Sequence, residues 1–228
     1  KNATGFLGVN NRQITMTGNN SVTTTSAAAL SLTNDAAILD TTTLLFTSLS
    51  STDSPTNGVL LSGVDGSLDV TGTGITVTNP TGVGVEIRDT QTGLAVNVPG
   101  TVTVTSGTAG GISLRNVNNG INKTVLFNSI NVQTDGGTGL LVKNTPPASG
   151  NGLVQINSGS IASTGGPALS ATNANLDISL ASVTSTNSAT TGISLIACDN
   201  SASAYPGVVI AATTVSEADS SGIFLQNN

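Results

Sequence analysis

The chain has 228 residues, of which 8% are charged, 2% are aromatic and 37% are hydrophobic, and its net charge is −6. An average soluble domain is roughly 25% charged. Lys and Arg together number six, so the chain lacks a basic face for phosphate backbones, and nucleic-acid binding is not expected. No apolar run approaches the roughly 18 residues that a membrane-spanning helix needs, so membrane insertion of this segment is not expected.

A repeat runs through the chain from end to end. Each copy places two apolar residues, one residue apart, before an Asn or Asp that follows two positions later. In chain order the copies begin at Leu7, Leu30, Val59, Val85, Ile112, Leu140, Leu169, Leu195 and Ile223. The steps between them are 23, 29, 26, 27, 28, 29, 26 and 28 residues. The turn position is filled by Asn11, Asn34, Gly63, Asp89, Asn116, Asn144, Asn173, Asp199 and Asn227.

Between these anchors, short runs of alternating apolar and polar residues are separated by clusters of Gly, Pro, Asn and Asp. Alternation with a period of two predicts strands, and the clusters predict turns. Three short strands in each repeat predict an all-β fold, a right-handed parallel β-helix (β-solenoid) with about eight coils of about 27 residues. Residues 1–228 are therefore expected to form a single β-solenoid domain, a fragment of a longer protein.

In such a coil, the apolar anchors point inward and stack in columns. One column is predicted to contain Val85, Ile112, Leu140, Leu169, Leu195 and Ile223, and its neighbour Ile87, Leu114, Val142 and Leu225. The copy near Gly192 has two readings, because its glycine favours Ile193 as the first anchor and Asp199 favours Leu195. The Asn and Asp residues are predicted to sit at turns, where Asn tolerates left-handed backbone conformations and stacked amides can form a ladder.

Several of the anchors share a Gly-apolar-x-apolar form. Among them are Gly111-Ile112-Ser113-Leu114, Gly139-Leu140-Leu141-Val142, Gly192-Ile193-Ser194-Leu195 and Gly222-Ile223-Phe224-Leu225. With a composition rich in Thr, Ser, Gly and Asn, this repeat resembles the right-handed β-helix passengers of bacterial autotransporters and other large secreted adhesins. The resemblance covers the whole chain and implies a protein that is secreted or exposed on the bacterial outer surface. It also implies a role as an adhesin passenger or structural stalk, with a host or cell-surface glycan or protein as partner.

Catalysis is not expected. Polysaccharide lyases and glycosidases need clustered carboxylates, and the twelve acidic residues here are scattered. The best cluster is Glu86 with Arg88 and Asp89, in which Glu86 is predicted to face solvent. Cys198 has no His to act as its base, and no cofactor or metal site is predicted. A carbohydrate-binding or carbohydrate-processing β-helix, a lyase, a glycosidase or a tail-spike-like module, is the alternative.

Ice binding is a third class, because ice-binding solenoids use flat Thr arrays. Thr76 and Thr78, followed by Thr101, Thr103 and Thr105, have this character. The corresponding later strands carry Asn131 and Ala162, so the Thr column is not expected to persist. The deciding observation is whether the outward residues of one sheet form a regular Thr array.

Three cations recur with the repeat itself. Arg88, Arg115 and Lys143 are separated by 27 and 28 residues, and each immediately precedes its turn residue. They are predicted to stack as a basic column on the outside of the rod, with Asp89 as partial compensation. The column is either solvated, with the side-chain stems covering apolar surface, or a binding site for an acidic glycan or an acidic partner surface. Unpaired strand edges at the two ends further predict end-to-end self-association.

Overall fold

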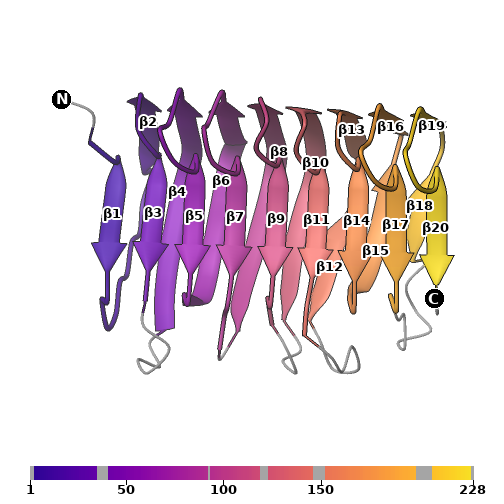
Figure 1. Ribbon diagram of the computed structural model, residues 1–228. Helices are drawn as coiled ribbons and strands as arrows, with labels where there is room; N and C mark the ends of the chain where they lie inside the picture. The colour runs from indigo at the N-terminus through magenta and orange to yellow at the C-terminus, as the bar shows by residue number, and fades with distance from the viewer. Residues whose placement is uncertain are drawn as a thin grey trace.

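The computed structural model describes residues 3–34, 41–91, 93–118, 123–145, 152–198 and 207–226. Within these ranges every regular element is a β-strand, and neighbouring strands pair in parallel. Successive coils stack along one axis (Figure 1), which confirms the predicted right-handed parallel β-helix. No helix in these ranges could cross a lipid bilayer.

One side of the coil is a nine-stranded sheet, here called the front sheet (Figure 1). Its strands are four residues long, because each holds one anchor pair between two turns. In stacking order they are β1 (Phe6–Val9), β3 (Leu30–Thr33), β5 (Val59–Ser62), β7 (Val85–Arg88), β9 (Ile112–Arg115), β11 (Leu140–Lys143), β14 (Leu169–Thr172), β17 (Ile193–Ile196) and β20 (Ile223–Gln226).

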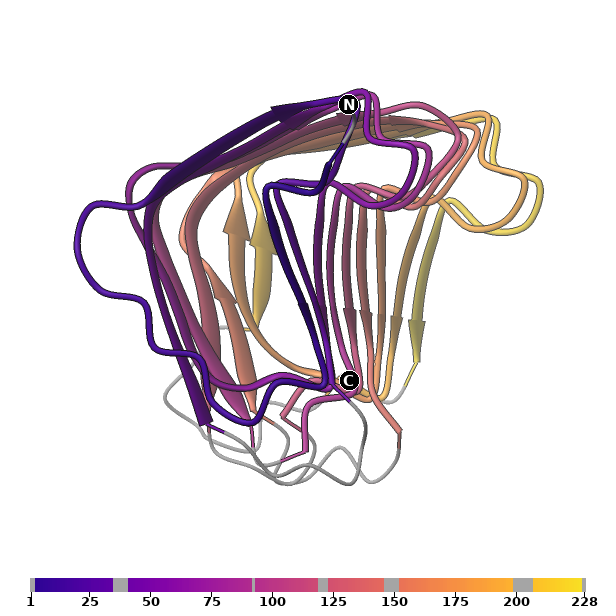
Figure 2. The same ribbon diagram turned by 90° about the vertical axis from the view of Figure 1, so that its left-hand side faces the viewer.

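The other two sides, here called the second and third faces, belong to one eleven-stranded sheet. Its strands are β2 (Ser21–Thr25), β4 (Thr41–Thr52), β6 (Asp65–Thr78), β8 (Leu94–Ser106), β10 (Thr124–Asp135), β12 (Leu153–Ile156), β13 (Gly159–Thr164), β15 (Asn175–Leu180), β16 (Ser182–Thr186), β18 (Val208–Ile210) and β19 (Thr213–Ser216). Viewed along the stack, the coil is three-sided (Figure 2).

In the coils that contain β4, β6, β8 and β10, one continuous strand covers both the second face and the third face. β4, β6, β8 and β10 each run along the second face, bend, and continue along the third face. The pairing register shifts at the bend, between Phe46 and Ser48 in β4 and between Phe127 and Ser129 in β10. From β12 onward, the two faces are formed by separate strands, as the sequence predicts for every coil.

The predicted interior columns are present, with one correction. Strand register stacks Val85, Ile112, Leu140 and Leu169 in one column, and all four are buried. The next member is Ile193, however, and Leu195 belongs to the neighbouring column. That second column runs Ile87, Leu114, Val142, Ala171, Leu195 and Leu225, so the stacking of its predicted members is confirmed. The last members of the two columns, Ile223 and Leu225, are 53% and 62% exposed and not buried as predicted.

The glycine before most of the front strands explains why Ile193 is the first anchor. A Cβ at this position would collide with an inward Val or Ile of the third face. This holds at Gly5, Gly58, Gly84, Gly111, Gly139 and Gly192, against Val22, Val77, Val104, Val132, Ile161 and Val215. Ala29 and Ala168 occupy the same position and are fully buried. The close approach of two faces therefore determines the register, and the Gly192 reading was the correct one.

The first coil differs by one residue from the prediction. Phe6 and Gly8 pair with Leu30 and Leu32, so they take the inward positions. Leu7 and Val9 face outward, with 65% and 60% of their surface exposed. The physical reason is the aromatic contact of Phe6 with Phe46, whose ring centroids lie 6.2 Å apart. A slip of one residue exchanges the two faces of a strand.

The predicted left-handed turn after the front strands is confirmed in part. Gly63, Asp89, Asn116 and Asn173 have positive φ angles there, whereas Asn34 and Asn144 do not. Asn10 rather than Asn11 takes this position in the first coil, and Ala197, with φ 49°, takes it after β17. Asp199 and Asn227 lie outside the described residues.

The amide ladder is only partly formed by side chains. Asn116 Nδ2 donates to Asp89 Oδ1 at 2.9 Å, which is the predicted contact between stacked turns. Asn144 Oδ1 instead accepts from the Val117 N–H at 3.0 Å, and Asn173 Nδ2 donates to the Asn144 carbonyl at 3.2 Å. These side chains therefore mainly satisfy the backbone of adjacent coils.

Candidate functional site

The three predicted cations form a column on the outside of the front sheet. Arg88 pairs with Arg115, and Arg115 pairs with Lys143, so they occupy consecutive positions at the ends of β7, β9 and β11. Adjacent strands lie about 4.8 Å apart. Ser62 and Thr172 continue the column on either side. The basic column is thus three positions long, with uncharged neighbours at both ends.

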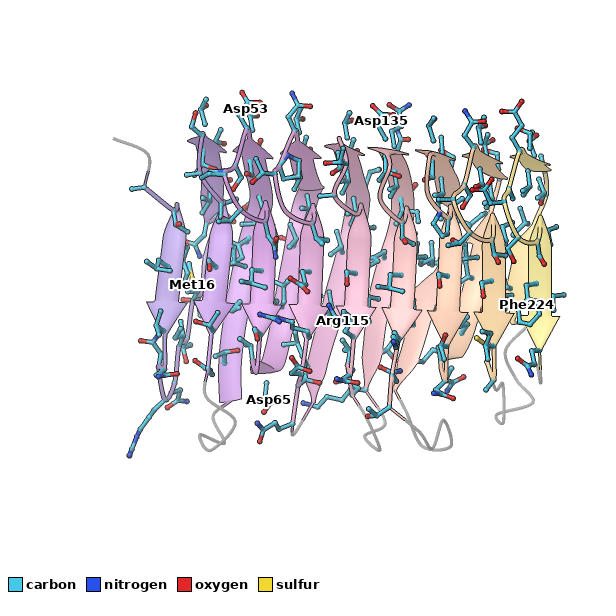
Figure 3. The ribbon with its side chains drawn as sticks, viewed as in Figure 1. Met16, Asp53, Asp65, Arg115, Asp135 and Phe224 are labelled. Carbon is cyan, nitrogen blue, oxygen red and sulfur yellow. The ribbon has the colours of Figure 1, made fainter. Side chains whose placement is uncertain are left out.

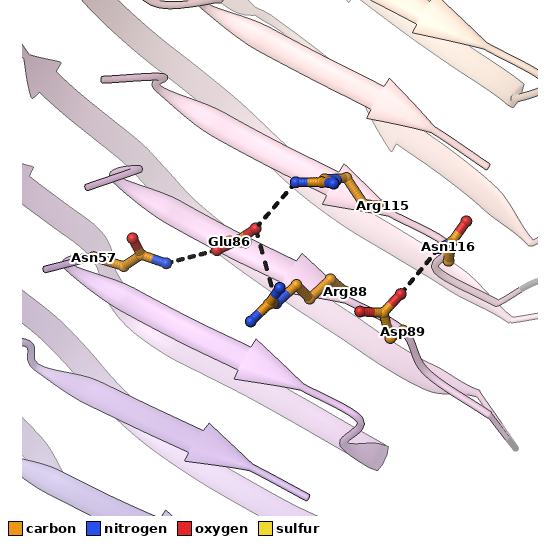
Figure 4. Close-up of polar contacts among 6 residues, drawn as sticks. All are labelled: Asn57, Glu86, Arg88, Asp89, Arg115 and Asn116. Carbon is orange, nitrogen blue, oxygen red and sulfur yellow. Dashed lines mark hydrogen bonds and ion pairs between the residues drawn. The ribbon is translucent and has the colours of Figure 1, made fainter. Parts of the chain in front are cut away.

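Glu86 lies at the centre of this column and was assigned wrongly from the sequence. It precedes Arg88 by two residues and therefore shares the outer face, but only 9% of its surface is exposed. Its Oε1 lies 3.9 Å from Arg88 Nε and 3.9 Å from Arg115 Nη1 (Figure 4). Its Oε2 accepts a hydrogen bond of 2.7 Å from Asn57 Nδ2. The expected solvent-facing carboxylate is therefore enclosed by three polar partners.

Glu86, and not Asp89, compensates the two arginines. Asp89 accepts the hydrogen bond from Asn116 Nδ2 instead (Figure 4). Within the described part of the chain, the ion pairs within 4.0 Å are those of Glu86 with the two arginines, and Lys143 takes part in neither. Three cations and one carboxylate leave this cluster with a formal charge of +2, in a chain whose net charge is −6.

The ion pairs orient the arginines more than they stabilise the fold. The side chains of Arg88 and Arg115 are 39% and 52% exposed. Exposed pairs of this kind contribute about 0.2–1 kcal/mol each. Both guanidinium groups nevertheless lie against one fixed carboxylate, while part of each side chain still faces solvent. Figure 3 shows Arg115 on the outside of the front sheet, midway along the rod.

Asn57 was missed by the sequence reasoning, because the repeat does not align it with Glu86. The residue stacked on Glu86 in the preceding coil is Leu60, and Asn57 lies three residues before it. The turn before β5 carries Asn57 to the edge of the front sheet, where its side chain reaches Glu86 in the next coil. A contact made from a turn has no fixed place in the repeat, so spacing alone could not identify it.

The remaining acidic residues near this region have structural partners. Asp65 is buried, and its Oδ1 accepts from the backbone N–H groups of Gln91 at 2.8 Å and Gly93 at 3.0 Å. Asp69 accepts from Asn97 Nδ2 at 3.2 Å. Asp65 thus holds the turn of the following coil. Among the described residues, no three His, Cys, Asp or Glu side chains gather in a way that could hold a metal ion.

Comparisons with known proteins identify no relative. No protein-family model, curated protein or solved structure matches this chain. The structure supports a parallel β-solenoid built from repeats, and the resemblance to autotransporter passengers rests on the sequence motifs alone. What the chain binds has to follow from its own side chains.

Proposed function

We propose that this chain is a non-enzymatic β-solenoid that is secreted or displayed on the bacterial outer surface and acts as an adhesive surface or stalk. Two features support the proposal: the chain forms a rod, and its side faces are free to carry contacts. Nine stacked front strands span about 40 Å at strand spacing. Such a rod can separate its two ends and present the same face over many coils.

The basic column is the observation that carries an adhesive role. Half of the six Lys and Arg residues lie on one line of an otherwise acidic chain. Arginine binds carboxylate or sulfate through two parallel hydrogen bonds. Glu86 holds two guanidinium groups in place, and an oriented donor loses less entropy on binding than a free one. We infer that the ligand is an acidic glycan or an acidic protein surface, bound across Arg88, Arg115 and Lys143.

The alternative, a carbohydrate-processing β-helix, has Glu86 as its best acid. Hydrolysis of glycosides needs a second carboxylate on the other side of the scissile bond. The nearest acid in sequence, Asp89, has its carboxylate hydrogen-bonded to Asn116. Both oxygens of Glu86 face donors of the protein itself. The geometry therefore favours recognition of an anion over bond cleavage.

Retention on heparin and on sialylated glycans tests this proposal. The purified chain is compared with an Arg88→Ala, Arg115→Ala double variant at low and moderate salt. An Arg88→Lys, Arg115→Lys variant is the matched control, because it keeps the charge and removes the paired hydrogen bonds. We expect strong retention of the original chain, intermediate retention of the Lys variant and the weakest retention of the Ala variant. Equal retention of the original and Ala chains refutes the site, and release of reducing sugar would favour the enzyme.

A further inference from the structure

A regular array of hydroxyl groups covers part of the third face. In the first four coils, every outward position in the last part of the third-face strands is Thr or Ser. One column contains Thr23, Ser50, Thr76 and Thr103, and the next contains Thr25, Thr52, Thr78 and Thr105. These eight residues are here called the hydroxyl array. Seven of them are Thr, so each row also presents methyl groups.

The backbone determines the spacing of the array. Strand pairing separates the rows by about 4.8 Å, and two residues along a strand separate the columns by about 6.6–6.8 Å. The β-branched Thr side chain has few rotamers, so the seven Thr hydroxyls have few alternative positions. Beneath the array, Ile75, Val77, Val102 and Val104 are buried in the core. The result is a rigid two-dimensional lattice of hydroxyl and methyl groups.

The array is open and uncharged. Thr23, Thr25, Thr76 and Thr105 are exposed, and the other members are half-buried. Asp53 follows Thr52 directly and lies at the rim of this face (Figure 3), in the turn after β4. Within the described part of the chain, the array hydroxyls form no hydrogen bond with another side chain or with the backbone.

The chemistry of the array selects among ligands. A sugar ring usually stacks on an aromatic side chain, and the array has none. Phe46 and Phe127 are fully buried, and Phe224 lies on β20 of the front sheet. An anion finds no cation there. A surface without charge or aromatic rings, but with hydroxyls on a fixed lattice, complements a ligand that is itself a lattice of hydrogen-bonding oxygens.

We propose that the hydroxyl array binds ice. The hydroxyls would hydrogen-bond a layer of water molecules between the rows, and the methyl groups would lie against that layer. Water bridging of this kind is nearly as favourable as direct hydrogen bonding.

The strand register shows where the Thr columns end, and their end was the reason that the sequence analysis argued against ice binding. Asn131 and Gln133 follow Thr103 and Thr105 in the two columns, so the Thr columns do stop, as expected. They stop, however, after four complete rows. The sequence analysis named Thr76, Thr78, Thr103 and Thr105 but not the rows at Thr23 and Ser50, which strand pairing adds.

The experiment is partition of the chain into slowly growing ice, together with inhibition of ice recrystallisation. The test variant is Thr76→Tyr, Thr103→Tyr, which places two bulky rings on adjacent rows. The matched control is Asn97→Tyr, which adds a ring at an exposed position of the same β8 strand but on the second face. A Thr76→Val, Thr103→Val variant keeps the shape and removes the hydroxyls. Circular dichroism establishes that each variant retains its β structure.

We expect the original chain and Asn97→Tyr to be enriched in the ice fraction above a non-binding protein of similar size. Both double variants should lose most of this enrichment, and the Val variant decides if the Tyr variant fails to fold. A chain that is excluded from ice, or a Val variant that partitions like the original, overturns the proposal. The array and the basic column lie on different sides of the coil, so heparin retention can fail while ice binding stands, and the reverse.

Discussion

Replacing Leu114 with Ala tests the column packing most directly. Leu114 is fully buried at the centre of the rod, between Ile87 and Val142 in its column. The change removes three carbon atoms, which by transfer alone costs about 2.4 kcal/mol. The interior cannot close around the gap, because hydrogen bonds to both adjacent coils hold the strand in place. With the cavity included, we expect a loss of about 2–5 kcal/mol.

The matched control is Leu225→Ala. Leu225 stands in the same column, but on the last front strand it is 62% exposed. Its replacement opens no closed cavity and should cost about 1 kcal/mol or less. Thermal unfolding followed by circular dichroism measures both, since 1 kcal/mol shifts the midpoint of a chain of this size by about 2–4 °C. Equal shifts for the two variants would show that burial of the leucine within the column does not determine how much stability is lost, and would refute the reasoning.

Three further predictions concern other parts of the rod. Asp65→Ala should destabilise the chain by about 2–4 kcal/mol in urea unfolding, because it leaves the buried N–H groups of Gln91 and Gly93 without an acceptor. Asp65→Asn retains an oxygen and should cost less. Equal losses for the two variants would argue that these two hydrogen bonds do not stabilise the turn. The apolar residues exposed on the last front strand should promote end-to-end association, seen as a sedimentation coefficient that rises with concentration. Ile223→Lys should reduce that rise, and a strictly monomeric original chain would contradict the idea. Burial raises the pKa of the Cys198 thiol, so less thiolate is present at any given pH. Labelling with maleimide at pH 8 should therefore be slower than for free cysteine and should accelerate as the pH rises. Labelling at the free-cysteine rate would show that the thiol is not buried.

The sequence predicts the coil well because inward residues stack on residues of the same kind. Val85, Ile112 and Leu140 could be placed in one column from spacing alone. Spacing is a weaker guide where two readings differ by two residues, since both keep the same face inward. At Ile193 the decision depends on Gly192 and Val215, which belong to different faces of the coil. Contact between faces is a three-dimensional property and has no fixed spacing in the chain.

The candidate site was predicted in position but not in its chemistry. Alternation correctly places Arg88, Arg115 and Glu86 on the outside of the front sheet. It also predicts that an outward carboxylate is solvated, which fails for Glu86, because the Asn57 turn and two long side chains enclose it. Burial of an outward residue depends on neighbouring turns and on side-chain length, and neither appears in a two-residue period.

The parallel stacking has a mechanical consequence. Hydrogen bonds between coils run along the rod axis, and each coil is bonded only to the coils beside it. Tension applied to the two ends would therefore peel coils away one at a time, beginning at the ends. A coil such as the 27 residues from Val85 to Gly111 occupies about 4.8 Å of the rod and spans about 90 Å when extended. Each coil that unfolds would lengthen its share of the rod about twentyfold, so the chain could extend under a sudden pull without breaking.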